Sequence, residues 1–558
     1  MIFIFLALAL IIIPWHSGYI YSGSDVRFHI NRIIEITHSL NKGFPLVNFT
    51  TFNKVGYDVN SFYPSPLLCI LSLVFLIKDP VNAYYILLLA LLFLTQFCTY
   101  IAGRALKMQQ ENAILFAIFY TFSEYMLFIL LYAFELGEAL AFVVLPLILV
   151  SIISYMQPMY VSKKFNKNQD VIFLLSFVWV TYSHLLSAMF CLLVTIPLLL
   201  LDVFRGRKWG LLKKYVIIGF NFALTTSFFW INLLHEYLFQ GIVGPKKYLS
   251  IPSAQHLITN SLENKLTTGN IDPVQSVGVG VILLISALVL ITNYFQLNKL
   301  VKTLTVFAVA FFILSSNLFC WDFLDNHIKN VEVLQFTFRF LIVVVLTLST
   351  AICLYHRGSW KMVLTFITCI TIFNINASKQ FVNLGQRQEM LNTEPTLRHE
   401  PMYGNFKVSN GTFKYLYQGF YGMTGGPGDY LTQQQKQHFN SIATHQVLLD
   451  GKRIKSDYTS NTNNITYTLR SSKKGTIDLP VLKTNHKYQV MDNGHLVSFG
   501  KSQRGTLNIN NLCAGRHVIN VRVIPSAIFE ISIVFSILGL SLIIIQLLKN
   551  VRGGNDSK

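Results

Sequence analysis

The sequence has few charged residues. Only 13% of its 558 residues are charged, whereas 53% are hydrophobic. A soluble domain carries about 25% charged residues, so this chain has too few charges to solvate a surface in water. The composition therefore excludes a soluble enzyme and a disordered chain. It predicts a membrane protein that crosses the bilayer several times.

Cysteine is also scarce where a disulfide framework would need it. The chain has seven cysteines, and only Cys513 lies in the long polar region near the C-terminus. No CxxC or Cys/His spacing is present, which excludes a secreted disulfide scaffold and gives no sign of a cysteine metal site. The net charge of +19 comes from short basic clusters between apolar runs, such as Lys163, Lys164 and Lys167. That placement is typical of membrane orientation and not of nucleic-acid binding.

Apolar runs long enough for membrane spans recur along the chain. The first, which lacks a basic n-region, is predicted to be an uncleaved span. With the short run 65–77 placed in the outer interface, the positive-inside rule favours about twelve spans and two cytoplasmic termini. The predicted spans are 1–15, 84–103, 112–132, 139–156, 171–184, 186–203, 215–239, 277–295, 303–320, 338–355, 362–376 and 526–548.

Three polar regions then face outward, at 16–83, 240–276 and 377–525. The last alternates apolar and polar residues in short stretches separated by turn signals, which predicts an antiparallel β-sandwich. The expected fold is thus an all-α membrane bundle with a C-terminal extracytoplasmic β-rich domain. The expected boundaries are 1–376 for the transmembrane domain, 377–525 for the β-rich domain, 526–548 for the last span and 549–558 for a cytoplasmic tail. The predicted strands include Ile465–Leu469, Tyr488–Met491 and His517–Val523, with turns at Asp450-Gly451 and Asp492-Asn493-Gly494.

The densest group of reactive side chains follows the first span, in Ser22-Gly-Ser-Asp-Val-Arg-Phe-His-Ile-Asn-Arg32. Ser24 is suited to cap a helix that begins at Asp25. On that helix Asp25, His29 and Arg32 are spaced i, i+4 and i+7, so they share one face. An acid, an imidazole and a guanidinium in line can deprotonate a hydroxyl and hold a phosphate. An amphipathic helix with internal salt bridges explains the same spacing.

Other candidates lie in the first loop or at the predicted outer ends of spans. Tyr63 stands in a proline-rich turn, which alone indicates only rigidity. Glu138 is costly there unless it is paired or faces a cavity. His184 lies in a tight turn, where a structural role is the commoner one. Arg339 can extend to the interface or bind a lipid phosphate.

Several short motifs together resemble bacterial membrane glycosyltransferases of the GT-C superfamily. The resemblance is to the branch that includes lipoteichoic-acid glucosyltransferases, which is also labelled "6-pyruvoyl-tetrahydropterin synthase related". It extends over essentially the whole chain. The motifs are GSDVRFHINRI, NKGFP, GYDVNSFYPSPL, ELGEALAFVVLPL, SHLLSA, LQFTFRFL, GDYLT and IDLPV.

The resemblance implies a reaction at the outer membrane face. A hexose would pass from a polyprenyl-phosphate donor to an extracytoplasmic glycan or teichoic acid at a bacterial plasma membrane. Asp25 would be the general base, and His29 and Arg32 would orient it or contact the donor phosphate. Arg339 would hold the lipid phosphate, and Glu138, His184 and Tyr63 would contact substrate. The first loop has no Asp-x-Asp motif, so no cofactor or metal is required, although a divalent cation is compatible with the sequence.

Two alternatives stay open. A polysaccharide or lipid transporter would place charges or broken helices near the membrane midplane, and Glu124, within a predicted span, fits that pattern. A noncatalytic scaffold of cell-envelope assembly would keep the fold without bringing Asp25, His29 and Arg339 together. The absence of a nucleotide-binding fingerprint favours a lipid-linked donor over a nucleotide sugar.

Overall fold

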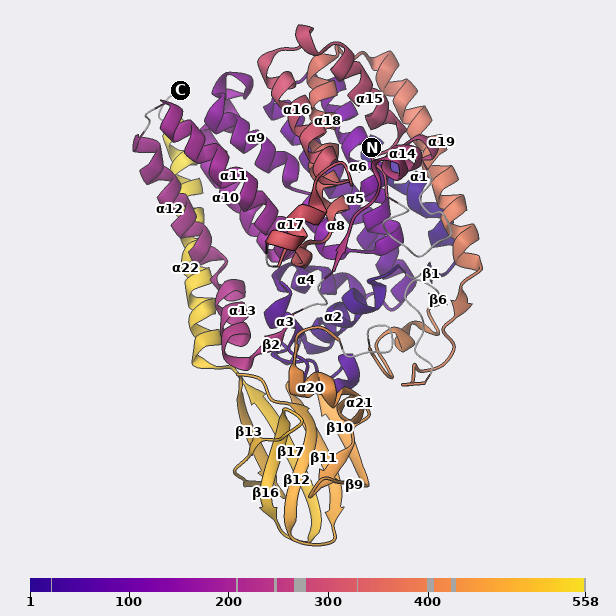
Figure 1. Ribbon diagram of the computed structural model, residues 1–558, viewed down its shortest axis with the longest axis vertical. Helices are drawn as coiled ribbons and strands as arrows, with labels where there is room; N and C mark the ends of the chain where they lie inside the picture. Colours follow the sequence, from indigo (N-terminus) through magenta and orange to yellow (C-terminus); the bar gives the residue numbers. More distant parts are fainter. Residues whose placement is uncertain are drawn as a thin grey trace.

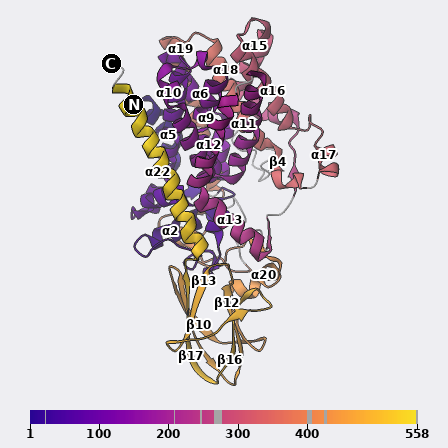
Figure 2. The same cartoon turned by 90° about the vertical axis from the view of Figure 1, so that its left-hand side faces the viewer.

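The computed structural model describes residues 1–21, 23–206, 209–244, 248–264, 277–328, 330–398, 406–422 and 428–555. Ser22 and the end of the predicted tail lie outside these ranges. A long bundle of helices forms one end of the molecule and a β-sandwich forms the other (Figure 1). Both chain termini lie in the part of the bundle away from the sandwich, and α22 runs along the bundle from the sandwich toward that end (Figure 2).

Within the described residues, five helices are long and apolar enough to cross a membrane, and three bent helix pairs also qualify. The chain is therefore compatible with a multi-pass membrane protein of five to eight such spans. The five are Pro80–Ala105, Leu185–Gly206, Thr337–Tyr355, Trp360–Gln386 and Ala527–Asn550. The bent pairs are Gln110–Thr121 with Glu124–Ala133, Leu136–Phe142 with Leu145–Met156, and Trp209–Thr225 with Ser227–Gln240.

Each of the twelve predicted runs falls on a helix or a bent pair, but four of the helices are too short or too polar to qualify. They are α1, α10, α15 and α16, so the number twelve stays a prediction. The main helices are α1 (Ile2–His16), α2 (Val26–Ser39), α3 (Val59–Phe62), α4 (Pro66–Leu71), α5 (Pro80–Ala105), α6 (Gln110–Thr121), α7 (Glu124–Leu127), α8 (Leu136–Phe142), α9 (Leu145–Met156), α10 (Lys163–Ser183), α11 (Leu185–Gly206), α12 (Trp209–Thr225), α13 (Ser227–Gln240), α14 (Ala254–Glu263), α15 (Val281–Thr292), α16 (Lys299–Leu314), α17 (Trp321–His327), α18 (Leu341–Tyr355), α19 (Trp360–Gln386), α20 (Gln433–Gln437), α21 (Phe439–Ala443) and α22 (Ala527–Asn555).

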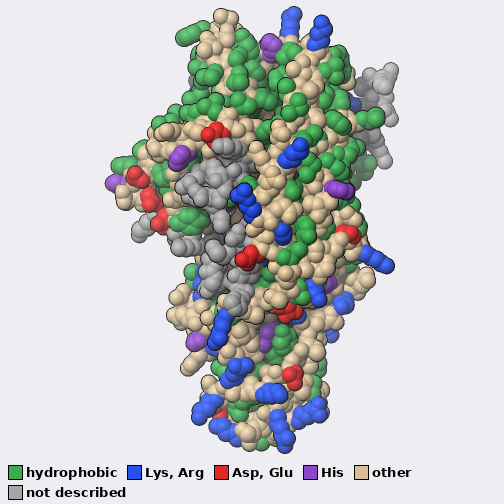
Figure 3. Space-filling view, turned by 90° about the vertical axis from the view of Figure 1, so that its right-hand side faces the viewer, with side chains coloured by type: hydrophobic (Ala, Val, Ile, Leu, Met, Phe, Trp, Pro, Cys, Tyr) green, Lys and Arg blue, Asp and Glu red, His purple; other side chains and the backbone are tan. Residues whose placement is uncertain are grey.

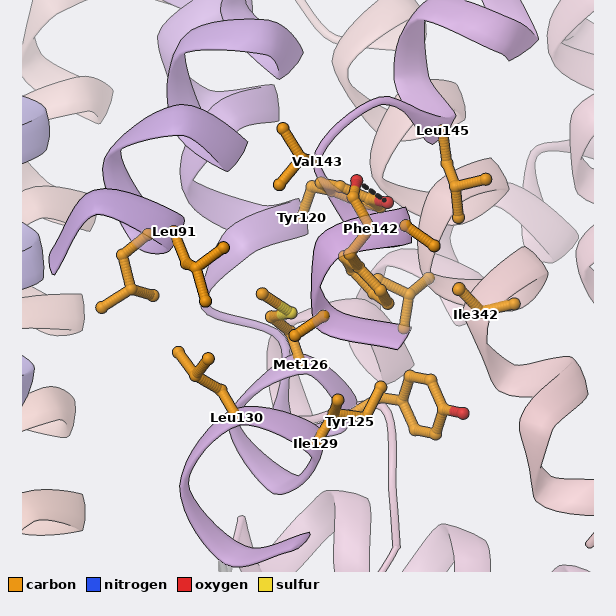
Figure 4. Close-up of a cluster of buried hydrophobic side chains, with 14 of the residues drawn as sticks. Leu91, Tyr120, Tyr125, Met126, Ile129, Leu130, Phe142, Val143, Leu145 and Ile342 are labelled. Atoms are coloured by element: carbon orange, nitrogen blue, oxygen red, sulfur yellow. Dashed lines mark hydrogen bonds between the residues drawn. The ribbon is translucent and has the colours of Figure 1, made fainter. Parts of the chain in front are cut away.

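Polar side chains join the helices inside an otherwise apolar core. Trp15 donates its indole N–H to Asn82 Oδ1 at 2.6 Å, which links α1 to α5. The break between α8 and α9 is held by Tyr120, whose hydroxyl donates to the carbonyl of Phe142 at 2.9 Å (Figure 4). These bonds pair polar groups inside the bundle and help to fix its bends and contacts.

The surface of the bundle differs from that of the sandwich. Hydrophobic side chains cover much of the bundle, while Lys and Arg side chains gather over the sandwich (Figure 3). The run 65–77, predicted to lie in the membrane interface, forms α4 and a following 3-10 turn (Ser72–Leu76). Ile70, Leu73 and Leu76 are exposed there, which leaves an apolar face for lipid.

The C-terminal region forms two five-stranded sheets that enclose one hydrophobic core. Their orders are β10-β11-β17-β13-β14 and β15-β16-β12-β8-β9, with every pairing antiparallel. The predicted strands are confirmed within β11, β13 and β17, and both predicted turns close hairpins with positive φ at Asp450, Gly451, Asn493 and Gly494. The strands are β8 (Val447–Leu449), β9 (Lys452–Ile454), β10 (Ser456–Asn461), β11 (Asn464–Ser471), β12 (Gly475–Leu482), β13 (Lys487–Asp492), β14 (His495–Leu496), β15 (Gly500–Lys501), β16 (Thr506–Leu512) and β17 (Gly515–Ile524).

The first polar loop lies between the bundle and the sandwich. The backbone N–H of Leu482 donates to Val55 O at 2.9 Å, and the Asn463 side chain bonds the backbone of Phe44 and Leu46. A small sheet adds a second connection, because β1 (Ile20–Tyr21) pairs with β6 (Phe406–Val408), which pairs with β5 (Glu389–Met390). Segments from both ends of the chain thus fix this loop in place.

Candidate functional site

Asp25 lies where the first loop meets the bundle. Its backbone N–H and the Ser24 hydroxyl both donate to the carbonyl of Ala133, at 3.0 and 3.2 Å. A Cβ on Gly23 would lie 2.3 Å from the Tyr132 carbonyl oxygen, so glycine permits this close approach. The helix starts at Val26 with Asp25 as its N-cap. The predicted capping role of Ser24 is therefore wrong, because its hydroxyl bonds Ala133 instead.

The other two residues of the predicted face, His29 and Arg32, are fully buried. Arg32 donates to the carbonyls of Tyr63 and Pro64 at 3.1 and 2.6 Å, and its guanidinium lies 4.3 Å from the centre of the Tyr63 ring. The His29 ring packs edge-on against Tyr63 and Phe134. Arg32 therefore holds the proline-rich turn in position, and His29 packs beneath it.

Tyr63 packs the first loop against the first turn of α8 (Leu136–Phe142). A Cβ on Gly137 would lie 2.3 Å from the Tyr63 hydroxyl oxygen and 2.9 Å from the carbonyl oxygen of Ser183. Only glycine leaves room for both atoms. The Tyr63 ring centre also lies 6.0 Å from that of His184. Residues from three sequence motifs thus meet at this one point.

Glu138, His184 and Arg339 line one end of an apolar cavity of about 160 Å³. The Tyr125 hydroxyl donates to Glu138 Oε1 at 2.6 Å, and His184 Nδ1 lies 2.9 Å from Ser187 Oγ. Arg339 Nη1 donates to the carbonyl of Leu334 at 2.9 Å, and Arg339 Nε has no partner among the described residues. This end of the cavity therefore carries a cation that is not fully hydrogen-bonded.

The rest of the cavity is lined mainly by apolar side chains of four helices, with Thr195, Thr303 and Thr347 interspersed among them. Along α11 the lining runs from Leu186 to Leu198, which corresponds to about 18 Å of helix. The remaining walls come from α9, α16 and α18, including Leu149, Phe307 and Ile342. The cavity is thus a narrow apolar groove with polar groups at one end. Its shape suits an elongated amphiphile, with a lipid tail in the groove and a charged head beside Arg339.

Burial and the charges around Asp25 raise its pKa to about 8. Removal of its carboxyl from water is the main cause, and the negative charge of Glu135 is the next. Arg339 opposes these effects, and Asp429 adds to them. Asp25 thus shares its surroundings with two further acids and one guanidinium. A carboxyl with this pKa exchanges protons near neutral pH, as a general base must.

Both histidines stay neutral at pH 7. Burial first and the charge of Arg339 second lower the pKa of His184 to about 3. The pKa of His29 is well below its usual value, first because of burial and then because of Arg32 and His184. Neutral imidazoles can orient a ligand by hydrogen bonds, but they add no positive charge for a phosphate. Arg339 is therefore the cation that faces the groove.

Reasoning from the sequence did not select Glu135 and Asp429 as site residues. Glu135 precedes α8 and acts electrostatically on Asp25, and Asp429 does so from the loop before β7 (Leu431–Thr432). The Tyr57 hydroxyl donates to the Asp429 carbonyl at 2.7 Å, and the ring of Tyr430 stacks on Phe62. The GDYLT motif was the available signal, but no spacing rule places it beside Asp25.

The cluster therefore unites most of the predicted residues. Glu138, His184 and Arg339 line the polar end of the groove, and Asp25 interacts electrostatically with Arg339, while Arg32 and Tyr63 build the support of this region. No family model, no curated protein and no solved structure matches this chain.

Proposed function

We propose that the protein is a GT-C-like membrane glycosyltransferase that moves a hexose from a polyprenyl-phosphate donor to an extracytoplasmic glycan or teichoic acid. One observation carries the proposal: the apolar groove ends at Arg339 and His184, next to the acids around Asp25. A polyprenyl-phosphate sugar has the same order of parts, an apolar tail, an anionic phosphate and a polar sugar. The groove takes the tail, and Arg339 pairs with the phosphate.

The proposed reaction needs one base and one stabilised leaving group. The Asp25 carboxylate removes the proton from an acceptor hydroxyl, whose oxygen attacks the anomeric carbon of the sugar. The bond from that carbon to the phosphate oxygen breaks, and its electron pair leaves with the polyprenyl phosphate. Arg339 stabilises the negative charge that develops there. Glu138 and the neutral histidines contact the sugar by hydrogen bonds.

The proposed topology places this chemistry outside the cell. About twelve spans and two cytoplasmic termini put the first loop and the sandwich on the extracytoplasmic side. The sandwich carries many of the basic residues on the surface, which favours an anionic acceptor such as teichoic acid (Figure 3). The acceptor then reaches Asp25 from the side where the loop and the sandwich meet.

A lipid or polysaccharide transporter is the second candidate, and Glu124 favours it. This acid is buried at the break between α6 and α7, where a Cβ on Gly278 would lie 2.6 Å from its Oε2. Buried acids at broken helices are typical of transport pathways. A scaffold role is weakened because Arg339 acts electrostatically on both Asp25 and His184, while His29 is linked electrostatically to this cluster through His184.

The test compares the sugar content of wall and membrane glycans in cells with the wild-type protein, with no protein, and with Asp25→Asn. NMR and mass spectrometry of the glycans are the readouts, at matched amounts of protein in the membrane. We expect the deletion and Asp25→Asn to lose the same sugar, because loss of a general base costs about 10²–10⁴-fold in rate. Asp457→Asn, on an exposed part of β10, is the matched control.

Full rescue of the deletion by Asp25→Asn would remove the catalytic assignment. If Glu124→Gln abolished the sugar while Asp25→Asn restored it, the transporter would become the better account.

A further inference from the structure

A second group of buried polar residues lies where the bundle, the first loop and the sandwich meet. Asp58 is the N-cap of α3, Glu236 lies on α13, and His486 lies between β12 and β13. They are 6%, 2% and 4% exposed. One ligand atom from each lies within 4.8 Å of the others. Three distant segments thus direct two carboxyl groups and one imidazole into one enclosed space.

The group lacks the hydrogen bonds that such burial requires. Neither carboxylate oxygen of Asp58 and neither ring nitrogen of His486 has a hydrogen-bond partner among the described residues. His486 Nε2 and Asp58 Oδ2 lie 3.5 Å apart, too far for a good hydrogen bond. Buried polar groups without partners are costly, and native proteins rarely contain several at one place. Four such atoms on two facing side chains indicate a missing ligand.

Neighbouring side chains do not supply the missing partner of Asp58 and His486. Glu236 Oε2 accepts from the Asn485 backbone N–H at 3.3 Å and from the Gln240 amide. The ammonium of Lys483 acts electrostatically on Glu236, but it donates to the Thr484 carbonyl at 3.0 Å and lies over the Tyr488 ring. Two carboxyl groups therefore share the space with an imidazole. A bound cation would neutralise them and satisfy the open ligand atoms at once.

The ligand atoms of Asp58, Glu236 and His486 indicate which kind of cation this group can bind. Ca²⁺ and Mg²⁺ prefer oxygen ligands alone, whereas Zn²⁺ binds imidazole nitrogen and carboxylate oxygen together. With Zn–N and Zn–O bonds of about 2.0–2.2 Å, a tetrahedral site separates adjacent ligand atoms by about 3.3–3.6 Å. The 3.5 Å between His486 Nε2 and Asp58 Oδ2 fits that edge. His235 Nδ1 lies 3.6 Å from Glu236 Oε1, beside the position of a fourth ligand.

We propose that Asp58, Glu236 and His486 form a binding site for one divalent transition-metal ion, and that Zn²⁺ is the ion it favours. The ion would tie the first loop to α13 and to the sandwich. Asp58 also begins the short α3, after which the chain reaches Tyr63 of the candidate active site. Metal binding would thus fix the position of that turn, in a structural role that does not depend on the proposed sugar transfer.

The test measures metal content of the purified full-length protein in detergent. The protein is stripped with EDTA, loaded with ZnCl₂, freed of excess ion and analysed by mass spectrometry for zinc. We expect about one zinc per wild-type chain, with little retention of Ca²⁺ or Mg²⁺ after the same treatment. Asp58→Asn, Glu236→Gln and His486→Gln should each lose the zinc.

His517→Gln is the matched control, because His517 also pairs with an acid, Asp492, at 2.8 Å but has no second carboxylate in reach of a metal within the described chain. It should keep the zinc. Co²⁺ loading gives a second readout, since a site of nitrogen and oxygen ligands lacks the intense thiolate absorption that Cys513 would produce. Each variant is compared only as a monodisperse fraction in gel filtration.

Three results would overturn the site: a wild-type chain that retains no zinc, zinc that persists in all three variants, or a thiolate spectrum with Co²⁺. The wild-type result stands even where a variant fails to fold. Because the readout is bound metal, its failure leaves the glycosyltransferase proposal untouched, and the reverse also holds.

Discussion

The two buried polar groups of this protein differ in what balances their acids. Around Asp25 the acids have Arg339 among them and open onto an apolar groove. Around Asp58 and Glu236 the described residues place the imidazole of His486, with His235 beside Glu236. Acids that share a guanidinium beside a groove fit the organic ligand that we propose. Acids that share a buried imidazole without hydrogen-bond partners fit the metal ion that we propose.

The largest effect should come from Arg339, which distinguishes the first group from the second. We expect Arg339→Gln to lower kcat by about 10²–10³-fold, because one fewer donor would stabilise the leaving phosphate. The measurement is sugar transfer from a polyprenyl-phosphate donor by the purified protein. Arg357→Gln, exposed between α18 and α19, is the control and should leave the rate unchanged. Equal activity in both variants would remove Arg339 from the reaction.

The pH profile tests the acids around Asp25. Since a general base acts only when unprotonated, a pKa of about 8 predicts that kcat/KM rises with pH and levels off above it. At pH 6 the value should be about 100-fold below the plateau. Glu135→Gln removes a negative charge that raises the pKa, so the midpoint should move to lower pH. A profile that falls between pH 6 and 8 would contradict the role of Asp25.

The groove can be tested without changing a charged residue or the polar end. Thr347 lines it on α18, and Thr347→Phe would fill part of the space for a lipid tail. We expect KM for the lipid donor to rise about tenfold with a smaller change in kcat, which corresponds to about 1.4 kcal/mol of lost binding. Thr365→Phe on the exposed side of α19 is the matched control. An unchanged KM in Thr347→Phe would place the lipid elsewhere.

The smallest effect concerns the proposed metal site. An ion at 100 times its Kd adds about 2.7 kcal/mol to stability, so EDTA should lower Tm by about 5 °C. Added ZnCl₂ should restore it in the wild type and in His517→Gln, but not in Asp58→Asn. Thermal unfolding of the detergent-solubilised protein gives the measurement. If neither EDTA nor ZnCl₂ changed the Tm of the wild type, that result would contradict a bound ion.

Local patterns predicted the parts of this structure that depend on near neighbours. The alternation in Ile465–Leu469 and the Asp-Asn-Gly turn at 492–494 have only one local solution, so β11 and the β13–β14 hairpin followed from them. Spacing of i and i+4 likewise placed Asp25 and His29 on one side of α2. Span number was less predictable, because helix bends and short helices such as α15 depend on packing against the rest of the bundle.

The rest depends on contacts between distant segments. No local rule brings Asp429 or Glu135 toward Asp25, or His486 toward Asp58, since sheet pairing and helix packing decide those positions. Ser24 shows the same effect on a smaller scale. Its sequence context favours a cap, but the Ser24 hydroxyl donates to the carbonyl of Ala133 and Asp25 occupies the N-cap position.

The pairing of β1 with β6 also has a consequence for biosynthesis. Tyr21 leaves the ribosome early, but its partner Lys407 follows nearly 400 residues later. At about 5–20 residues per second, translation alone delays this pairing by roughly 20–80 seconds. Until then the emerged first loop lacks this partner strand, and the membrane holds a growing chain whose candidate site is unfinished. Synthesis of the chain past Lys407, and not insertion of its first helices, is therefore the step that completes this sheet.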